Sequence, residues 1–146
     1  MKVELRVVPE REEPAVVVEV PALTGEAETL AQRIRGLFPR PVTLWQGERA
    51  VPVEPEKILR FYARDKGVFA QTGEGEFIVR ARLYELEEEL DGHTFVRISQ
   101  SEIVNLKQIT ALDLSLTGTI KITLAGGAVT YTSRRYVKKI KQALGL

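Results

Sequence analysis

FVRISQSEIVNLKQITALDLSLTGTIKITLAGGAVTYTSRRYVKKIKQALGL, Phe95 to Leu146, is the stretch that determines the fold predicted for this chain. It contains the motif RISQSEIVNL, Arg97 to Leu106, in which the spacing of apolar residues predicts a strand and a tight turn. The polar side chains of this motif can donate hydrogen bonds, as a surface for phosphates and base edges requires. The stretch also contains the densest basic run in the chain, RRYVKKIK, Arg134 to Lys141.

Positive charge is concentrated in this C-terminal third. From Arg97 onward there are eight basic and two acidic residues, a net charge of +6, whereas the whole chain carries +1 and its first 96 residues therefore −5. A nearly neutral protein with one basic end can bind a polyanion at that end without non-specific electrostatic binding over the rest of its surface. A solvated C-terminal helix, in which the helix dipole favours lysines, explains the same charge. Charge alone leaves both interpretations open.

Length and composition indicate an ordinary globular protein. The 146 residues suit one domain, or one domain with a small extension. No apolar run approaches the roughly 18 residues of a membrane span. The chain has no cysteine, which excludes disulfides, thiolate metal sites and cysteine nucleophiles. Acidic residues near the N-terminus, where a signal peptide would be apolar, agree with a cytoplasmic location.

Residues 1–40 are predicted to form a small β-β-α extension. Lys2–Val8 and Ala15–Val20 have strand-like patterns, and prolines flank the second. Thr24 can cap a helix that ends near Gly36 to Pro39. We interpret this extension as a packing or dimerisation unit.

Residues 41–146 are predicted to form the main domain, in an α+β fold that is mainly β. Short antiparallel strands alternate with glycine-containing turns. In the turn Asp65-Lys66-Gly67, Gly67 is expected to take the positive φ. Helices are predicted at Arg82–Leu90 and Arg134–Leu144. The strands are predicted at 42–45, 49–53, 58–63, 68–72, 77–79, 95–98, 108–112, 119–124 and 128–132.

No constellation in the sequence indicates an enzyme, a metal site or a cofactor. The acidic run Glu85 and Glu87 to Glu89 is better explained as the solvated face of a helix. The single histidine, His93, lies in a turn and has no neighbouring nucleophile. We therefore predict no catalytic residues, no bound metal and no cofactor.

Four segments, in order and spacing, resemble the LytTR DNA-binding domain family from about Pro41 to Leu146. They are Arg82 to Glu87, Phe95 to Asn105, Ile122 to Gly127 and Ser133 to Tyr136, with Lys57 to Leu59 preceding them. The resemblance implies an elongated fold of small antiparallel sheets with flanking helices. One departure concerns Ser99 and Gln100, which stand where the family usually has His followed by Arg or Lys.

The resemblance also implies a DNA-binding transcriptional regulator whose loops, rather than a recognition helix, enter successive major grooves. By position, Gln100 and Arg135 correspond to base-reading residues, and Gln suits adenine while Arg suits guanine or phosphate. Asn105 is either a DNA contact or the cap of a turn, and Arg97 is a phosphate contact or structural. The complete predicted set is Lys66, Arg97, Ser99, Gln100, Ser101, Asn105, Arg134, Arg135, Lys138 and Lys139.

The expected partners are double-stranded DNA and a second copy of the chain, because one small module reads too few bases to be selective. Standalone members of the family often work with a membrane protein that senses the signal, so the resemblance implies such a partner as well. The alternative function is a protein-interaction module that kept the fold and lost DNA binding. The substitution of Ser99 and Gln100 for the usual basic pair suggests this alternative.

Overall fold

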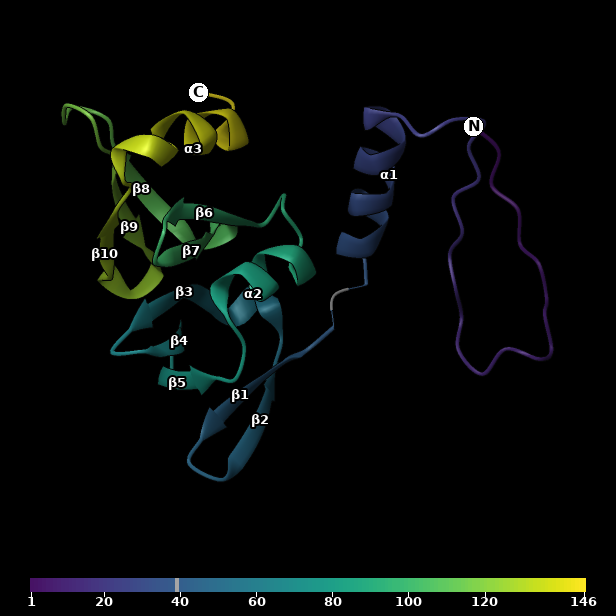
Figure 1. Cartoon of the computed structure of the whole chain (residues 1–146), viewed down its shortest axis with the longest axis horizontal. Helices are drawn as coiled ribbons and strands as arrows, with labels where there is room; N and C mark the ends of the chain where they lie inside the picture. Colours follow the sequence, from purple (N-terminus) through teal and green to yellow (C-terminus); the bar gives the residue numbers. More distant parts are fainter. Residues whose placement is uncertain (39) are drawn as a thin grey trace.

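The computed structural model describes residues 1–38 and 40–146, which form three α-helices and ten strands connected by turns and short 3-10 segments (Figure 1). Within these ranges, no helix is long and apolar enough to cross a membrane. The elements are α1 (Gly25–Gly36), β1 (Val42–Gln46), β2 (Arg49–Val53), β3 (Ile58–Arg64), β4 (Gly67–Thr72), β5 (Gly75–Val79), α2 (Leu83–Glu89), β6 (Phe95–Ser99), β7 (Glu102–Asn105), β8 (Ile109–Asp113), β9 (Lys121–Leu124), β10 (Val129–Tyr131) and α3 (Val137–Leu144).

Seven of the strands form one antiparallel sheet in the order β2-β1-β5-β4-β3-β7-β6. Strand β1 pairs with β5 at Trp45 opposite Ile78, and Leu44 of β1 is fully buried in the core beneath this junction. Helix α2 packs against the sheet through Leu83 and Leu86. The first apolar core lies between them and contains Leu44, Ile58, Phe61, Ala70, Phe77, Val79, Leu83, Leu86, Phe95 and Ile103.

The other three strands form a second sheet in the order β10-β9-β8, next to α3. Ile140 of α3 is fully buried in the second core, together with Leu59, Val96, Ile98, Val104, Ile120, Ile122 and Leu124. The β6–β7 hairpin contributes to both cores, because successive side chains of a strand point to opposite faces. Phe95 and Ile103 enter the first core, while Val96 and Val104 enter the second. The hairpin is therefore fixed from both sides.

The prediction of an α+β, mainly β fold is confirmed, and nearly all of the strands after Pro41 lie within two residues of their expected positions. The turn between β3 and β4 differs in one detail. Asp65 and Lys66 have positive φ values of 49° and 65°, and Gly67 is instead the first residue of β4. A two-residue hairpin turn of this kind requires positive φ at both central positions. Lys66 is consequently at the tip of the turn, where its side chain is exposed.

The predicted strands of the N-terminal extension are wrong for this structure, although its helix is confirmed. Residues 2–8 and 15–20 form no strand and are almost entirely exposed, in an open loop beyond α1 (Figure 1). Alternation of apolar and charged residues marks a segment that can be half-buried in a sheet, but a strand also needs a hydrogen-bonding partner. An isolated two-stranded hairpin is at best marginally stable in water.

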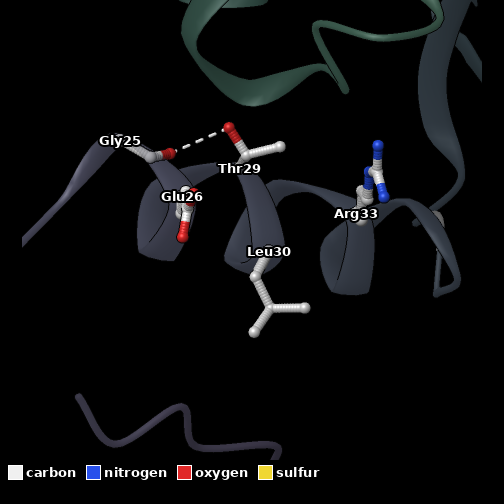
Figure 2. Close-up of a pocket in the computed structure, with 5 residues that line it drawn as sticks. All are labelled: Gly25, Glu26, Thr29, Leu30 and Arg33. Carbon is white, nitrogen blue, oxygen red and sulfur yellow. Dashed lines mark hydrogen bonds between the residues drawn. The ribbon is translucent and has the colours of Figure 1, made fainter. Parts of the chain in front are cut away.

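Helix α1 begins as expected, because the Thr24 hydroxyl accepts a hydrogen bond from the amide of Ala27 at 3.2 Å. Figure 2 shows Leu30 and Arg33 pointing away from the helix in different directions, and the Thr29 hydroxyl donating to the carbonyl of Gly25 at 2.9 Å. No residue of α1 is buried. The helix is therefore held by its cap and its own hydrogen bonds, without a packed apolar face.

Candidate nucleic-acid interface

The turn between β6 and β7 is shaped by its own side chains. The Ser99 hydroxyl accepts a hydrogen bond from the amide of Ser101 at 3.2 Å, and the two serine hydroxyls are 3.3 Å apart. The serines are thus occupied in forming the turn, as serines in turns commonly are. Gln100, between them, has an exposed side chain. Of the three polar residues predicted here, Gln100 is the one whose side chain is left to contact a partner.

The Arg97 side chain stabilises this turn through hydrogen bonds to its backbone. Its Nε donates to the carbonyl of Ser99 at 2.8 Å, and its guanidinium also donates to the carbonyl of Gln100. The remaining Nη1 is 2.8 Å from a carboxylate oxygen of Glu87 on α2. Only 15% of the Arg97 side chain is exposed, so its donors are used internally. Of the two predicted roles, the geometry supports the structural one.

Asn105 is completely buried and does not face solvent. Its side-chain amide donates to the carbonyl of Ile58 at 2.8 Å and to that of Glu56 at 3.3 Å. Its side-chain oxygen accepts from the amide of Lys107 at 3.0 Å, which caps the short 3-10 turn after β7. The structure thus places Asn105 away from any DNA surface, and the turn-cap interpretation describes it.

Backbone hydrogen bonds bring two other segments to the β6–β7 turn. The amide of Ser133, where β10 leads into α3, donates to the carbonyl of Ile98 at 2.9 Å. The amide of Ala63, near the end of β3, donates to the carbonyl of Ser101 at 2.8 Å. The end of β3, the β6–β7 turn and the β10–α3 junction therefore lie next to one another and are joined by backbone hydrogen bonds, although they are far apart in sequence.

A shallow groove beside the turn is lined by apolar residues and by charged or polar ones, which are Lys66, Arg80, Arg82, Tyr84, Glu85, Arg97 and Gln100. Arg80 and Arg82 are exposed and were not predicted as site residues. The guanidinium of Arg80 lies over the ring of Trp45, 3.4 Å from its centroid, which fixes the position of the charge. The only hint in the sequence is the run Arg80-Ala81-Arg82 after β5, because the groove is formed by residues distant in the chain.

The β10–α3 junction presents a second group of cations. Arg134 and Arg135 are exposed on the single 3-10 turn Arg134–Tyr136, and Lys138 is exposed on the first turn of α3. In the part of the chain that the structure describes, none of these three forms an ion pair. Lys139 differs, because its Nζ is 3.4 Å from a carboxylate oxygen of Glu87.

The sequence model of the LytTr DNA-binding domain matches residues 48–145. This chain belongs to the LytTR family. An uncharacterised HTH-type transcriptional regulator of Staphylococcus aureus (strain MSSA476) is 31% identical over the whole of this chain and 99% of its own length. A similarly named protein from strain NCTC 8325 is 44% identical over 61% of this chain and 60% of its own. A solved LytTr DNA-binding domain from Bacillus cereus has a TM-score of 0.70 and 26% identity, over 73% of this chain and 98% of that domain.

The LytTR domain also contains a partly buried ion pair directly after the turn. Glu102, the first residue of β7, lies 3.3 Å from Arg60 of β3. Burial raises the pKa of the Glu102 carboxyl, while hydrogen bonds and the charge of Arg60 oppose that shift. One of its carboxylate oxygens is buried without a hydrogen-bond partner among the described residues. Arg60 is further fixed by Gln71, whose side-chain oxygen is 2.7 Å from its Nε. This pair supports the base of the turn and is not itself exposed to a ligand.

Proposed function

We propose that this LytTR protein is a sequence-specific transcriptional regulator whose β6–β7 turn and β10–α3 junction enter successive major grooves of DNA. The observation that carries the proposal is the backbone hydrogen bond from Ser133 to Ile98, which joins these two segments, with Gln100 and Arg135 exposed on either side. A backbone that is already ordered before binding loses little conformational entropy, which favours recognition.

Each exposed residue has a proposed role. Gln100 makes a bidentate contact to adenine, and Arg135 contacts guanine. Lys66, Lys138 and Arg134 neutralise phosphates, as do Arg80 and Arg82 in the groove. Backbone contacts of this kind position the protein on the duplex, while the base contacts specify the sequence.

The printed names of the S. aureus relatives describe them as HTH-type. In the described part of this chain, however, each α-helix is separated from the next by strands, so no two consecutive helices form a helix-turn-helix unit. The proposed reading elements are therefore the turn and the junction.

The test is a titration of the protein against a duplex selected from a random library and against a scrambled duplex, at several salt concentrations. If about five to eight phosphates are neutralised, log K should fall with log salt with a slope of roughly −5 to −7. The selected duplex should also bind far more tightly than the scrambled one. A slope near zero, or equal affinity for both duplexes, would contradict sequence-specific DNA binding.

A second candidate function is a protein-interaction module, which is favoured by Ser99 and Gln100 in place of the usual basic pair. A mobility-shift assay with total genomic fragments at two salt concentrations separates the two, since only a DNA-binding protein gives a salt-sensitive shift. We further propose that the regulator acts in the cytoplasm as a homodimer on paired half-sites about one helical turn apart. A membrane protein that senses the signal is its proposed regulatory partner.

A further inference from the structure

The first eight residues present two chemically distinct faces. The Nζ of Lys2 is 3.9 Å and the Nε of Arg6 is 3.4 Å from the carboxylate of Glu4, so these three side chains lie together. The intervening Val3, Leu5 and Val7 are 90%, 94% and 87% exposed. Contacts between residues two apart are typical of extended chain. Residues 2–8 thus have the form of a strand that lacks a partner, with three apolar side chains in water.

Residues 15–20 of the same chain are an incomplete partner. The hairpin register that gathers the apolar side chains on one face sets Val3 opposite Val20 and Leu5 opposite Val18. The same register sets Glu4 opposite Glu19, and like charges directly opposite are destabilising. A hairpin of these two segments would also leave the outer edge of residues 2–8 unpaired. Its stability therefore depends on additional strands.

We propose that residues 2–8 pair with the same residues of a second copy of the chain, antiparallel about a two-fold axis at Leu5. This register sets Val3 opposite Val7 of the partner subunit, and Leu5 opposite Leu5 of the partner subunit. It also sets Glu4 opposite Arg6 of the partner subunit, twice by symmetry. In this register, the acidic residue of each copy thus lies opposite a basic residue of the other copy. The inference rests on the proposed homodimer and specifies how it forms.

Neighbouring registers lack this complementarity. A shift by one residue places apolar side chains opposite charged ones. A shift by two sets Glu4 opposite itself or Arg6 opposite itself. A parallel, in-register pair also aligns like charges. Because register is fixed by side-chain pattern, one arrangement is strongly favoured.

Residues 15–20 of each chain can then add at the outside, which gives a four-stranded sheet with one wholly apolar face. Helix α1 is suited to cover that face, since Ala27, Leu30 and Ile34 lie along one side and are only half-buried. Its 12 residues span about 18 Å, close to the roughly 20 Å of a six-residue strand. The extension of two chains would thus form a two-layer unit that holds two LytTR domains together.

Disulfide trapping in the full-length protein tests the register. The natural chain has no cysteine, so Leu5→Cys introduces a single thiol. With oxidised glutathione, Leu5→Cys should form a covalent dimer in high yield, because directly opposed strand residues have Cα atoms about 4.5–5.5 Å apart. Val3→Cys and Val7→Cys should each remain largely uncrosslinked alone but form a heterodimer when mixed. Equal crosslinking of all three variants, or none for Leu5→Cys, would overturn the register.

A charge exchange tests the complementarity by sedimentation equilibrium. Glu4→Arg alone and Arg6→Glu alone should each weaken the dimer about ten-fold or more, since two attractive pairs become repulsive. The double variant Glu4→Arg/Arg6→Glu should restore dimerisation to near the natural level. Failure of restoration, or a natural chain that is monomeric at high concentration, would refute the proposal. DNA binding to a single half-site, measured in parallel, should be unchanged in all variants, so failure of the dimer is distinguished from failure of the DNA-binding function.

Discussion

The basic residues of the C-terminal third of the chain form two groups that differ in how their charges are used. Arg97 and Lys139, which we call the anchored cations, both contact Glu87 of α2. Arg134, Arg135 and Lys138, the unanchored cations, have no ion pair in the described part of the chain. All five belong to the segment with a net charge of +6. The net charge therefore overstates the positive charge that is available to DNA, because Glu87 on the acidic helix α2 already pairs with two of these five cations.

The largest expected effect concerns Asn105, whose side chain, like those of the anchored cations, is bonded within the protein. Asn105→Ala should lower the free energy of unfolding by about 2–4 kcal/mol, because it leaves buried backbone groups without their partners. Urea denaturation followed by circular dichroism measures it. Gln100→Ala, at an exposed side chain of the β6–β7 turn, is the control and should change stability by about 0.5 kcal/mol or less. A small loss for Asn105→Ala would mean that its side chain is not structural.

The second-largest expected effect concerns Arg135, one of the unanchored cations, and the exposed Gln100. Arg135→Ala should cost about 1–3 kcal/mol of binding free energy on the selected duplex and little on a scrambled one. Gln100→Ala should show the same preference, with a smaller loss if Gln100 makes a single hydrogen bond. Fluorescence titrations of both duplexes measure it. Equal losses on the two duplexes would show that Arg135 contacts only phosphate.

Releasing the anchored cations should have a moderate and opposite effect. Glu87→Gln removes the carboxylate that holds Lys139 and one nitrogen of Arg97. Binding to scrambled DNA should become tighter, and the salt slope steeper by about one unit. Glu88→Gln is the matched control, since it makes the same charge change on α2 at an exposed residue without an ion pair among the described residues. If both variants increase the affinity for DNA equally, the increase is a general charge effect, and the distinction between anchored and unanchored cations fails.

The smallest effect compares two adjacent lysines of α3. Lys138→Ala should reduce the salt slope by about one unit, as expected for one lost phosphate contact. Lys139→Ala should reduce it by roughly half as much, because Glu87 already neutralises part of its charge. Salt titrations of the two variants in parallel provide the measurement. A larger change for Lys139→Ala would place Lys139 among the cations that contact DNA.

The positions of strands and turns in the LytTR domain could be predicted because they depend on local pattern. Whether a polar residue is exposed could not, because it depends on partners elsewhere in the chain. Arg97 is anchored by Glu87, ten residues earlier and on another element, and Asn105 bonds to carbonyls almost fifty residues away. Arg80 and Arg82 enter the groove only once β5 lies beside β4. In the extension, the alternating pattern predicted strands at residues 2–8 and 15–20 that the structure does not form, because pattern alone does not supply the partner that a strand needs.

The burial of the β6–β7 hairpin on both faces has a consequence for the dynamics of the proposed DNA-binding surface. Amides in such an element are expected to exchange with solvent only when the whole domain opens. The turn that carries Gln100 is thus attached to the slowest-exchanging part of the chain. Its shape should be the same in free and bound protein, and DNA has to adapt to it by bending or by adjusting its groove width.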